Sequence, residues 1–94
     1  MSYPKALMDA LEARCDGMCE RCETKPAGNV HHRLLKSRGG KDTPENCVAV
    51  CGTGTTGCHG WIHGHPAEAT ATGWMVPSWL DPAMVPAIPL SGQR

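Results

Sequence analysis

The feature that most constrains this chain is the order in which its cysteines and histidines occur. Two pairs of cysteines, with gaps of two and six residues, enclose a His-His pair, and three further histidines follow the last thiol. Four thiols can close a tetrahedral zinc site, and the histidines are surplus to it. The pattern therefore predicts one ligand set that supports the fold and a second that does chemistry, as in a metal-dependent hydrolase. The thiols are Cys19, Cys22, Cys51 and Cys58, and the other candidates are His31, His32, Asn46, His59 and His63.

The size and composition of the chain explain why its fold needs a stabilising cross-link such as a structural metal. Its 94 residues include 11 Gly, 8 Pro and no Phe, so we expect residues 1–94 to form a single domain with a small core. Such domains usually depend on disulfides or a structural metal. The first residues lack the apolar core of a signal peptide, so we expect a reducing cytoplasm, where thiols favour zinc. No apolar run approaches the ~20 residues of a membrane span, and no membrane partner is expected.

The charge of the chain is balanced overall but not locally. The net charge is zero, yet residues 24–41 contain five basic residues and no carboxylate. A basic stretch around a pair of histidines suits a polyanionic substrate. A solvated loop with ordinary surface charges is the simpler explanation of the stretch taken alone.

Local patterns in the first half of the chain predict a helix and a β-hairpin. Apolar residues recur at helical spacing over 4–14, which predicts an N-terminal helix. Residues 29–35 and 48–51 are typical of strands. Between them, paired glycines within 37–41 are typical of a flexible loop, and 42–46 predicts a single capped turn.

The second half predicts helices and an extended tail. A short helix is expected from residue 58 to about 66, a second over 67–72, and a Pro-rich packing tail over 73–94. The expected fold is therefore small α+β, with a hairpin and helix as a core over 19–66. The apolar side chains expected in the hydrophobic interior are Met8, Leu11, Trp61, Trp74, Val76, Trp79 and Leu80.

Two further cysteines leave the zinc assignment open. Cys47 precedes Val-Ala-Val and is most simply a small buried side chain. Cys15 could replace Cys19, because Cys15-x3-Cys19 and Cys47-x3-Cys51 are also ligand-like pairs. We expect the four thiols named first to form the site.

The histidines are placed for a metal-assisted reaction. Imidazole is a common ligand for transition metals, and His59 and His63 would share one face of a helix. His31 would supply a third ligand and leave open positions, the mark of a catalytic site. Side chains alternate along a strand, so His32 would face away from that ion and could take a proton from water at neutral pH. Asn46 cannot transfer protons but can hold a loop or an imidazole through its amide.

Three motifs in this order resemble the HNH endonucleases of the ββα-metal (His-Me finger) fold. The resemblance is close to the small, zinc-stapled bacteriophage members, in which two cysteine pairs bracket the active hairpin, and it covers residues 19–66. The motifs are His31-His32-Arg33, Gly39-Gly40-Lys41-Asp42-x3-Asn46 and Cys58-His59-x3-His63.

The resemblance implies a role for each matching residue. It implies that His31, His59 and His63 hold one catalytic divalent ion, which could be Mg²⁺, Mn²⁺, Ni²⁺ or Zn²⁺. It implies that His32 is the general base and that Asn46 orients the hairpin loop and the base. The cysteines would hold a structural Zn²⁺. The basic residues expected near DNA phosphates are Arg33, Lys36 and Arg38.

The resemblance also implies a function and a setting. Members cleave or nick DNA, and phage members are often encoded near the packaging terminase. By analogy, we expect a DNA endonuclease that assists genome packaging with terminase in the host cytoplasm.

Two other classes of protein compete with this hypothesis. A catalytically silent zinc module that binds nucleic acid or a protein would explain the thiols but not the surplus histidines. A redox or iron–sulfur protein would use the six cysteines and also leave the histidines unexplained.

Overall fold

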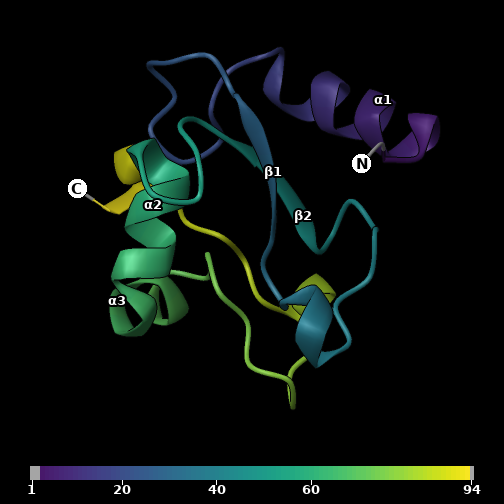
Figure 1. Ribbon diagram of the computed structural model, residues 1–94, viewed down its shortest axis with the longest axis vertical. Coiled ribbons are helices and arrows are strands. Elements are labelled where there is room, and N and C mark those ends of the chain that lie inside the picture. The colour runs from purple at the N-terminus through teal and green to yellow at the C-terminus, as the bar shows by residue number, and fades with distance from the viewer. Residues whose placement is uncertain (1–2, 94) are drawn as a thin grey trace.

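The computed structural model describes residues 3–93, which form a hairpin with helices on both of its sides (Figure 1). The N-terminal helix α1 packs on one face of the hairpin, and α2 packs on the other and continues into α3. The elements are α1 (Lys5–Cys15), β1 (Asn29–His32), β2 (Cys47–Val50), α2 (Gly57–Gly64), α3 (Pro66–Ala71) and 3₁₀ turns at Lys36–Arg38, Pro82–Met84 and Leu90–Gln93.

The expected small α+β fold, with a hairpin, helices and a cluster of four cysteines, is confirmed. The first strand is shorter than predicted and ends at His32 rather than at residue 35. It ends early because the backbone N–H and C=O of Leu34 pair with the side chain of Asn46 instead of with β2. The loop predicted over 37–41 overlaps a 3₁₀ turn, which Gly39 ends in the left-handed region at φ 93°.

Alternation of side chains along the hairpin builds a core on each of its faces. The strands are antiparallel, with His31 opposite Val48 and His32 opposite Cys47. Successive residues therefore point to opposite sides, one toward α1 and the other toward α2. On the face toward α1, Cys47 of β2 packs with Leu7 and Leu11 of α1. The face toward α2 buries Cys19, Val48, Val50, Cys51, Cys58, Ile62, Ala69 and Trp74.

The tail contributes less to the core than the sequence predicts. Trp74 and Val76 are 1% and 5% exposed, so their predicted burial is confirmed. Trp79 and Leu80 are 81% and 45% exposed, and the prediction that they cover the core is wrong. They lie in a turn, closed by the Leu80 N–H donating to the Pro77 carbonyl (3.1 Å), that points both side chains outward.

Met8 is also exposed, at 41%, although the sequence predicts it in the core. The buried stripe of α1 is narrow and consists of Leu7 and Leu11, one turn apart. Met8 follows Leu7 by about 100° around the helix axis and so lies outside the stripe.

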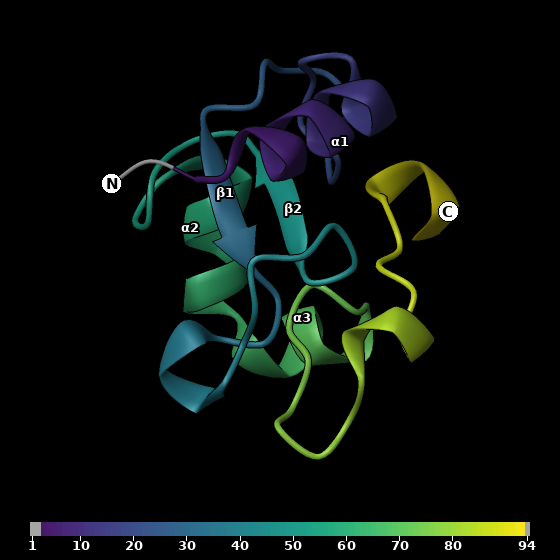
Figure 2. The same ribbon diagram turned by 90° about the vertical axis from the view of Figure 1, so that its right-hand side faces the viewer.

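The tail returns along the molecule to the cysteine region (Figure 2). The Leu90 N–H donates to the carbonyl of Arg21 (2.9 Å), and the Ser91 hydroxyl donates to Glu23 (2.6 Å). Across residues 3–93, the helices are all too short to reach across the apolar part of a bilayer.

The hairpin loop leaves no room for a side chain at Gly40. A Cβ added there would lie 1.7 Å from the carbonyl oxygen of Leu34. We predict that Gly40→Ala lowers the free energy of unfolding by about 3 kcal/mol, because the loop backbone has to move. Thermal unfolding measures this loss. Gly64→Ala is the matched control, because a Cβ at Gly64 meets nothing within 4 Å; equal stability of the two variants would contradict the prediction.

Candidate metal centres and active site

The four thiols predicted to bind zinc lie together at the junction of three segments. Two come from the knuckle between α1 and β1, one follows β2, and one lies in the first turn of α2. Their sulfur atoms all lie within 4.8 Å of one another. Backbone N–H groups donate to two of the sulfurs, at 3.5 and 3.4 Å. The set is Cys19, Cys22, Cys51 and Cys58, so the structure excludes Cys15 and Cys47 from this group.

The electrostatics of this cluster favour a bound cation. Burial raises the pKa of the Cys58 thiol to about 12, although a hydrogen bond from Arg21 (3.4 Å) opposes the rise. Burial also acts on Cys22, but hydrogen bonds from Thr24 and the neighbouring thiols outweigh it and lower its pKa to about 6. The thiolate of Cys22 forms readily here, whereas burial raises the pKa of Cys19 and Cys58, whose thiolates need a positive partner. A tetrahedral site for Zn²⁺ fits this donor set.

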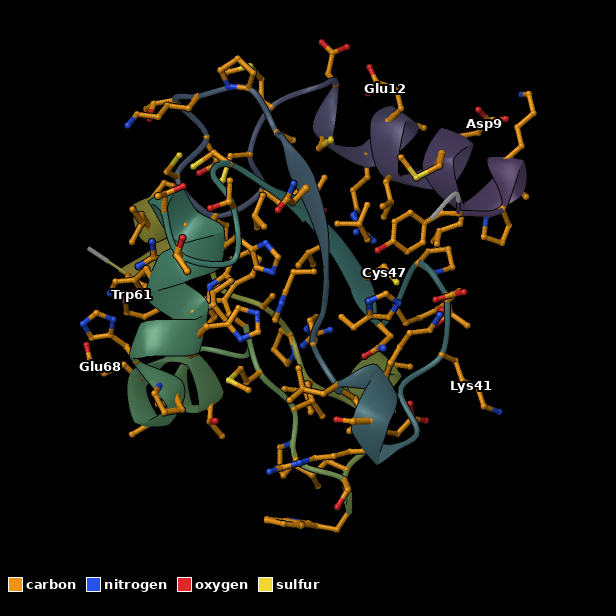
Figure 3. All side chains as sticks on the ribbon, in the orientation of Figure 1. Asp9, Glu12, Lys41, Cys47, Trp61 and Glu68 are labelled. Atoms are coloured by element: carbon orange, nitrogen blue, oxygen red, sulfur yellow. The ribbon has the colours of Figure 1, made fainter. Side chains whose placement is uncertain are left out.

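Arg21 connects the cluster to the outer side of α2. Its guanidinium carbon lies 3.7 Å from the ring centre of Trp61, the labelled side chain on the outer side of α2 in Figure 3. Arg21 thus places a buried positive charge beside the thiol of Cys58.

Three histidines form the second cluster, between the hairpin and α2. His31 comes from β1 and is 2% exposed, whereas His59 and His63 lie one turn apart on α2. One nitrogen from each ring lies within 4.8 Å of the others, and the Nε2 atoms of His59 and His63 are 3.2 Å apart. The structure therefore brings together the three imidazoles that the sequence predicts as ligands.

Protein oxygens fix the orientation of two of these rings. Nε2 of His31 donates to the Trp74 carbonyl (2.9 Å), and Nδ1 of His59 donates to Oδ1 of Asn29 (2.9 Å). Each bond leaves the other ring nitrogen with its lone pair available for a metal.

The two rings are also held in the neutral form that a metal requires. Burial lowers the pKa of His31 to about 4, even though the Trp74 carbonyl opposes the shift. Burial and the neighbouring His63 lower the pKa of His59. The cluster therefore fits a divalent ion with open coordination positions.

His32 faces the other side of the hairpin. Its Nε2 lies 2.7 Å from Oδ1 of Asp42, which also lies 3.5 Å from Nζ of Lys36. The hydrogen bond from His32 is the main reason that the pKa of Asp42 is lowered, and Lys36 adds to it. An ionised carboxylate only accepts, so Nε2 carries the proton and Nδ1 holds the free lone pair. The ring of Tyr3 lies 5.8 Å away, centre to centre.

Asn46 is 2% exposed and holds the hairpin loop closed. Its Oδ1 accepts from the Leu34 N–H (2.7 Å), and its Nδ2 donates to the carbonyls of Leu34 and Lys41 (both 3.0 Å). The side-chain amide of Asn46 therefore holds both ends of the loop that carries Asp42. Within the described residues, the hydrogen-bond partner of His32 is Asp42 rather than Asn46.

The prediction that Arg33 contacts a DNA phosphate is corrected by the structure. Arg33 is 5% exposed, and its guanidinium donates inward to backbone carbonyls that include Gly73 (2.7 Å), Glu45 (2.8 Å) and Val85. A buried guanidinium with these partners ties the tail to the hairpin and is not free to meet a phosphate. Lys36 and Arg38 lie on the loop beside it, and Lys36 is half-exposed.

Comparison with known proteins bears on the sequence resemblance. The family model of the HNH endonucleases matches residues 19–63, the segment that holds the thiol cluster and the three-histidine cluster. The resemblance to the HNH endonucleases is confirmed. A relative, the type IV methyl-directed restriction enzyme EcoKMcrA of Escherichia coli (strain K12), is 38% identical over 56 residues. The match covers 50% of this chain and 19% of that enzyme, so the chain corresponds to about a fifth of its relative. No solved structure matches the chain.

The groups that orient the histidines of this segment were not predicted from the sequence. Asn29 precedes His31 by two positions in β1, so the period of a strand would have put both on one face. Asp42 is separated from His32 by a loop, and the carbonyl of Trp74 carries no sequence signal. These partners depend on tertiary contacts.

We predict that Cys22→Ser loses its zinc and its cooperative fold. Metal binding and folding are coupled in small zinc domains, where the ion contributes about 10–16 kcal/mol. Zinc content and far-UV circular dichroism measure both losses. Cys15→Ser, which changes a thiol outside the cluster, is the control and should keep zinc and fold. A well-folded, zinc-free Cys22→Ser protein would contradict a structural site.

Proposed function

We propose that this chain is a metal-dependent endonuclease that hydrolyses or nicks the phosphodiester backbone of DNA. One observation carries the proposal: His31 and His32 are neighbours in β1, yet His31 joins the histidine cluster and His32 meets the carboxylate of Asp42. An ion site and a proton acceptor on adjacent residues can act on two sides of one phosphorus atom. The HNH match over 19–63 and the likeness to a restriction enzyme support DNA cleavage as the chemistry.

His31, His59 and His63 would hold one divalent ion, which could be Mg²⁺, Mn²⁺, Ni²⁺ or Zn²⁺. When bound, the ion would supply Lewis-acid polarisation of the phosphate and neutralise charge on the leaving oxygen. The hydrogen bonds to Trp74 and Asn29 support this role, because they fix two rings before any ligand arrives. Cys19, Cys22, Cys51 and Cys58 would hold a separate, structural Zn²⁺.

His32 would act as the general base. Nδ1 would take a proton from a water molecule as the water attacks the phosphorus, and Nε2–H would stay bonded to Asp42. The carboxylate would stabilise the imidazolium that forms. Asn46 would serve this step indirectly, because it holds the loop on which Asp42 lies.

Lys36 and Arg38 would contact phosphates of the bound strand from the edge of this loop. The net charge of the chain is zero, so binding should be modest and should weaken as salt is added. We expect weak sequence preference, since a dedicated reading element is not evident in the sequence.

The wider setting extends the proposal by analogy. Residues 1–94 would act as a single domain with its core over 19–66, an N-terminal helix and a C-terminal packing tail. The protein would work in the cytoplasm, in a phage-infected host if phage-encoded, and would assist terminase in genome packaging. The rival hypothesis, a silent zinc module, predicts the same thiol site without cleavage.

Cleavage of supercoiled plasmid tests the proposal. Protein that retains its thiol-bound zinc is freed of weakly held ions and supplied separately with Mg²⁺, Mn²⁺, Ni²⁺ and Zn²⁺. We predict cleavage with at least one ion, reduced by about 10²–10⁴-fold in His32→Ala because the general base is gone. His32→Ala should keep its fold and metal content.

His65→Ala is the matched control. His65 is exposed and stacks on Trp61, outside both metal clusters. Its removal should leave cleavage unchanged. Absence of cleavage with every ion, in folded protein that holds zinc, would overturn the endonuclease in favour of the silent module. Full activity of His32→Ala would overturn the assignment of the base alone.

A further inference from the structure

A third group of possible metal ligands lies on the α1 side of the hairpin. His32, Asp42 and Cys47 each offer one ligand atom, and these atoms lie within 4.8 Å of one another. Pairing of the two strands places Cys47 directly opposite His32. Figure 3 labels Cys47 on the part of the hairpin nearest α1, away from α2. The group is therefore separate from the thiol cluster and from the three-histidine cluster.

We propose that His32, Asp42 and Cys47 form an inhibitory Zn²⁺ site that takes His32 out of the reaction. The inhibitory part of this inference rests on the proposed function, because it assumes that His32 is the general base. The binding part does not, since it concerns only the three side chains and the ion.

The donor set selects zinc over the harder ions. One thiolate, one imidazole and one carboxylate match the ligands of zinc sites with three protein groups and an open position. Mg²⁺ prefers oxygen ligands and octahedral geometry, and a thiolate suits it poorly. An ion in the histidine cluster would support cleavage, while Zn²⁺ at the third group would suppress it.

The protons of the site account for the inhibition. In the free protein Nε2–H of His32 donates to Asp42, which leaves Nδ1 as the base. A zinc ion bound at Nε2 would shift the ring proton to Nδ1, and an ion bound at Nδ1 would occupy the lone pair itself. In either case the imidazole can no longer accept a proton from water.

Two groups compete with zinc binding at this site. Burial raises the pKa of the Cys47 thiol to about 11, so zinc has to displace one proton from sulfur to bind. Nζ of Lys36, 3.5 Å from Asp42, competes with the ion for the carboxylate. The side chains of His32 and Asp42 are 11% and 30% exposed, which gives the ion a path to the buried sulfur. Such a site would fill only when free zinc rises.

The first test counts bound zinc without DNA. Full-length protein is dialysed against graded free Zn²⁺, and Cys47→Ala is compared with Cys15→Ala, which removes a thiol outside every cluster. We expect Cys47→Ala to bind one zinc ion fewer than wild type and Cys15→Ala to match wild type. Equal zinc content of Cys47→Ala and wild type would overturn the site, whether or not the protein cleaves DNA.

The second test adds zinc to Mg²⁺- or Mn²⁺-supported plasmid cleavage. Cys47→Ala should cleave at the wild-type rate without zinc, and its half-inhibiting zinc concentration should rise by about tenfold or more. Loss of a partner that only orients a ligand already costs about 10–100-fold in metal affinity, and loss of the ligand should cost no less. Unchanged inhibition of Cys47→Ala would place the inhibitory ion elsewhere and overturn the proposal.

Discussion

The fold depends on the four thiols that meet where the knuckle, the end of β2 and the start of α2 converge. The domain is small, and its two apolar cores are too modest to fix the angle between hairpin and helix unaided. Cys51 and Cys58 are joined by a short loop in which Gly52 and Gly57 adopt positive φ values of 85° and 63°. The loop brings both sulfurs to one point and sets where α2 begins.

The meeting point of the four thiols also sets the position of the histidine cluster. His59 follows the zinc candidate Cys58 directly, so the helix start that the thiols fix also fixes the two imidazoles of α2. The hairpin supplies the other half of the site. Alternation along β1 sends His31 toward α2 and His32 toward the loop of Asp42, and Asn46 holds that loop in place. The four thiols and the histidines thus occupy neighbouring positions in the sequence but separate environments in space.

Much of this arrangement could be predicted from the sequence, because candidate metal ligands can be recognised by their residue types and their spacing. The four thiols and the three-histidine cluster follow from side chains that have few other reasons to recur in this order. The burial or exposure of Arg33, Trp79 and Met8 could not be predicted in the same way. Whether an arginine meets solvent or carbonyls, and whether a tail residue turns inward, depends on packing between distant segments. The hydrogen bonds of Asn29 to His59 and of Asp42 to His32 depend on tertiary contacts and are seen only in the structure.

Substitution with Co²⁺ tests most directly whether one chain holds two chemically different metal centres. We predict intense visible absorption from a tetrahedral thiolate site that survives a moderate chelator, and weaker absorption from an exchangeable, nitrogen-ligated site. His59→Ala should remove the weaker bands and leave the thiolate bands intact. A single class of bound cobalt, or thiolate bands that disappear with His59, would contradict the account.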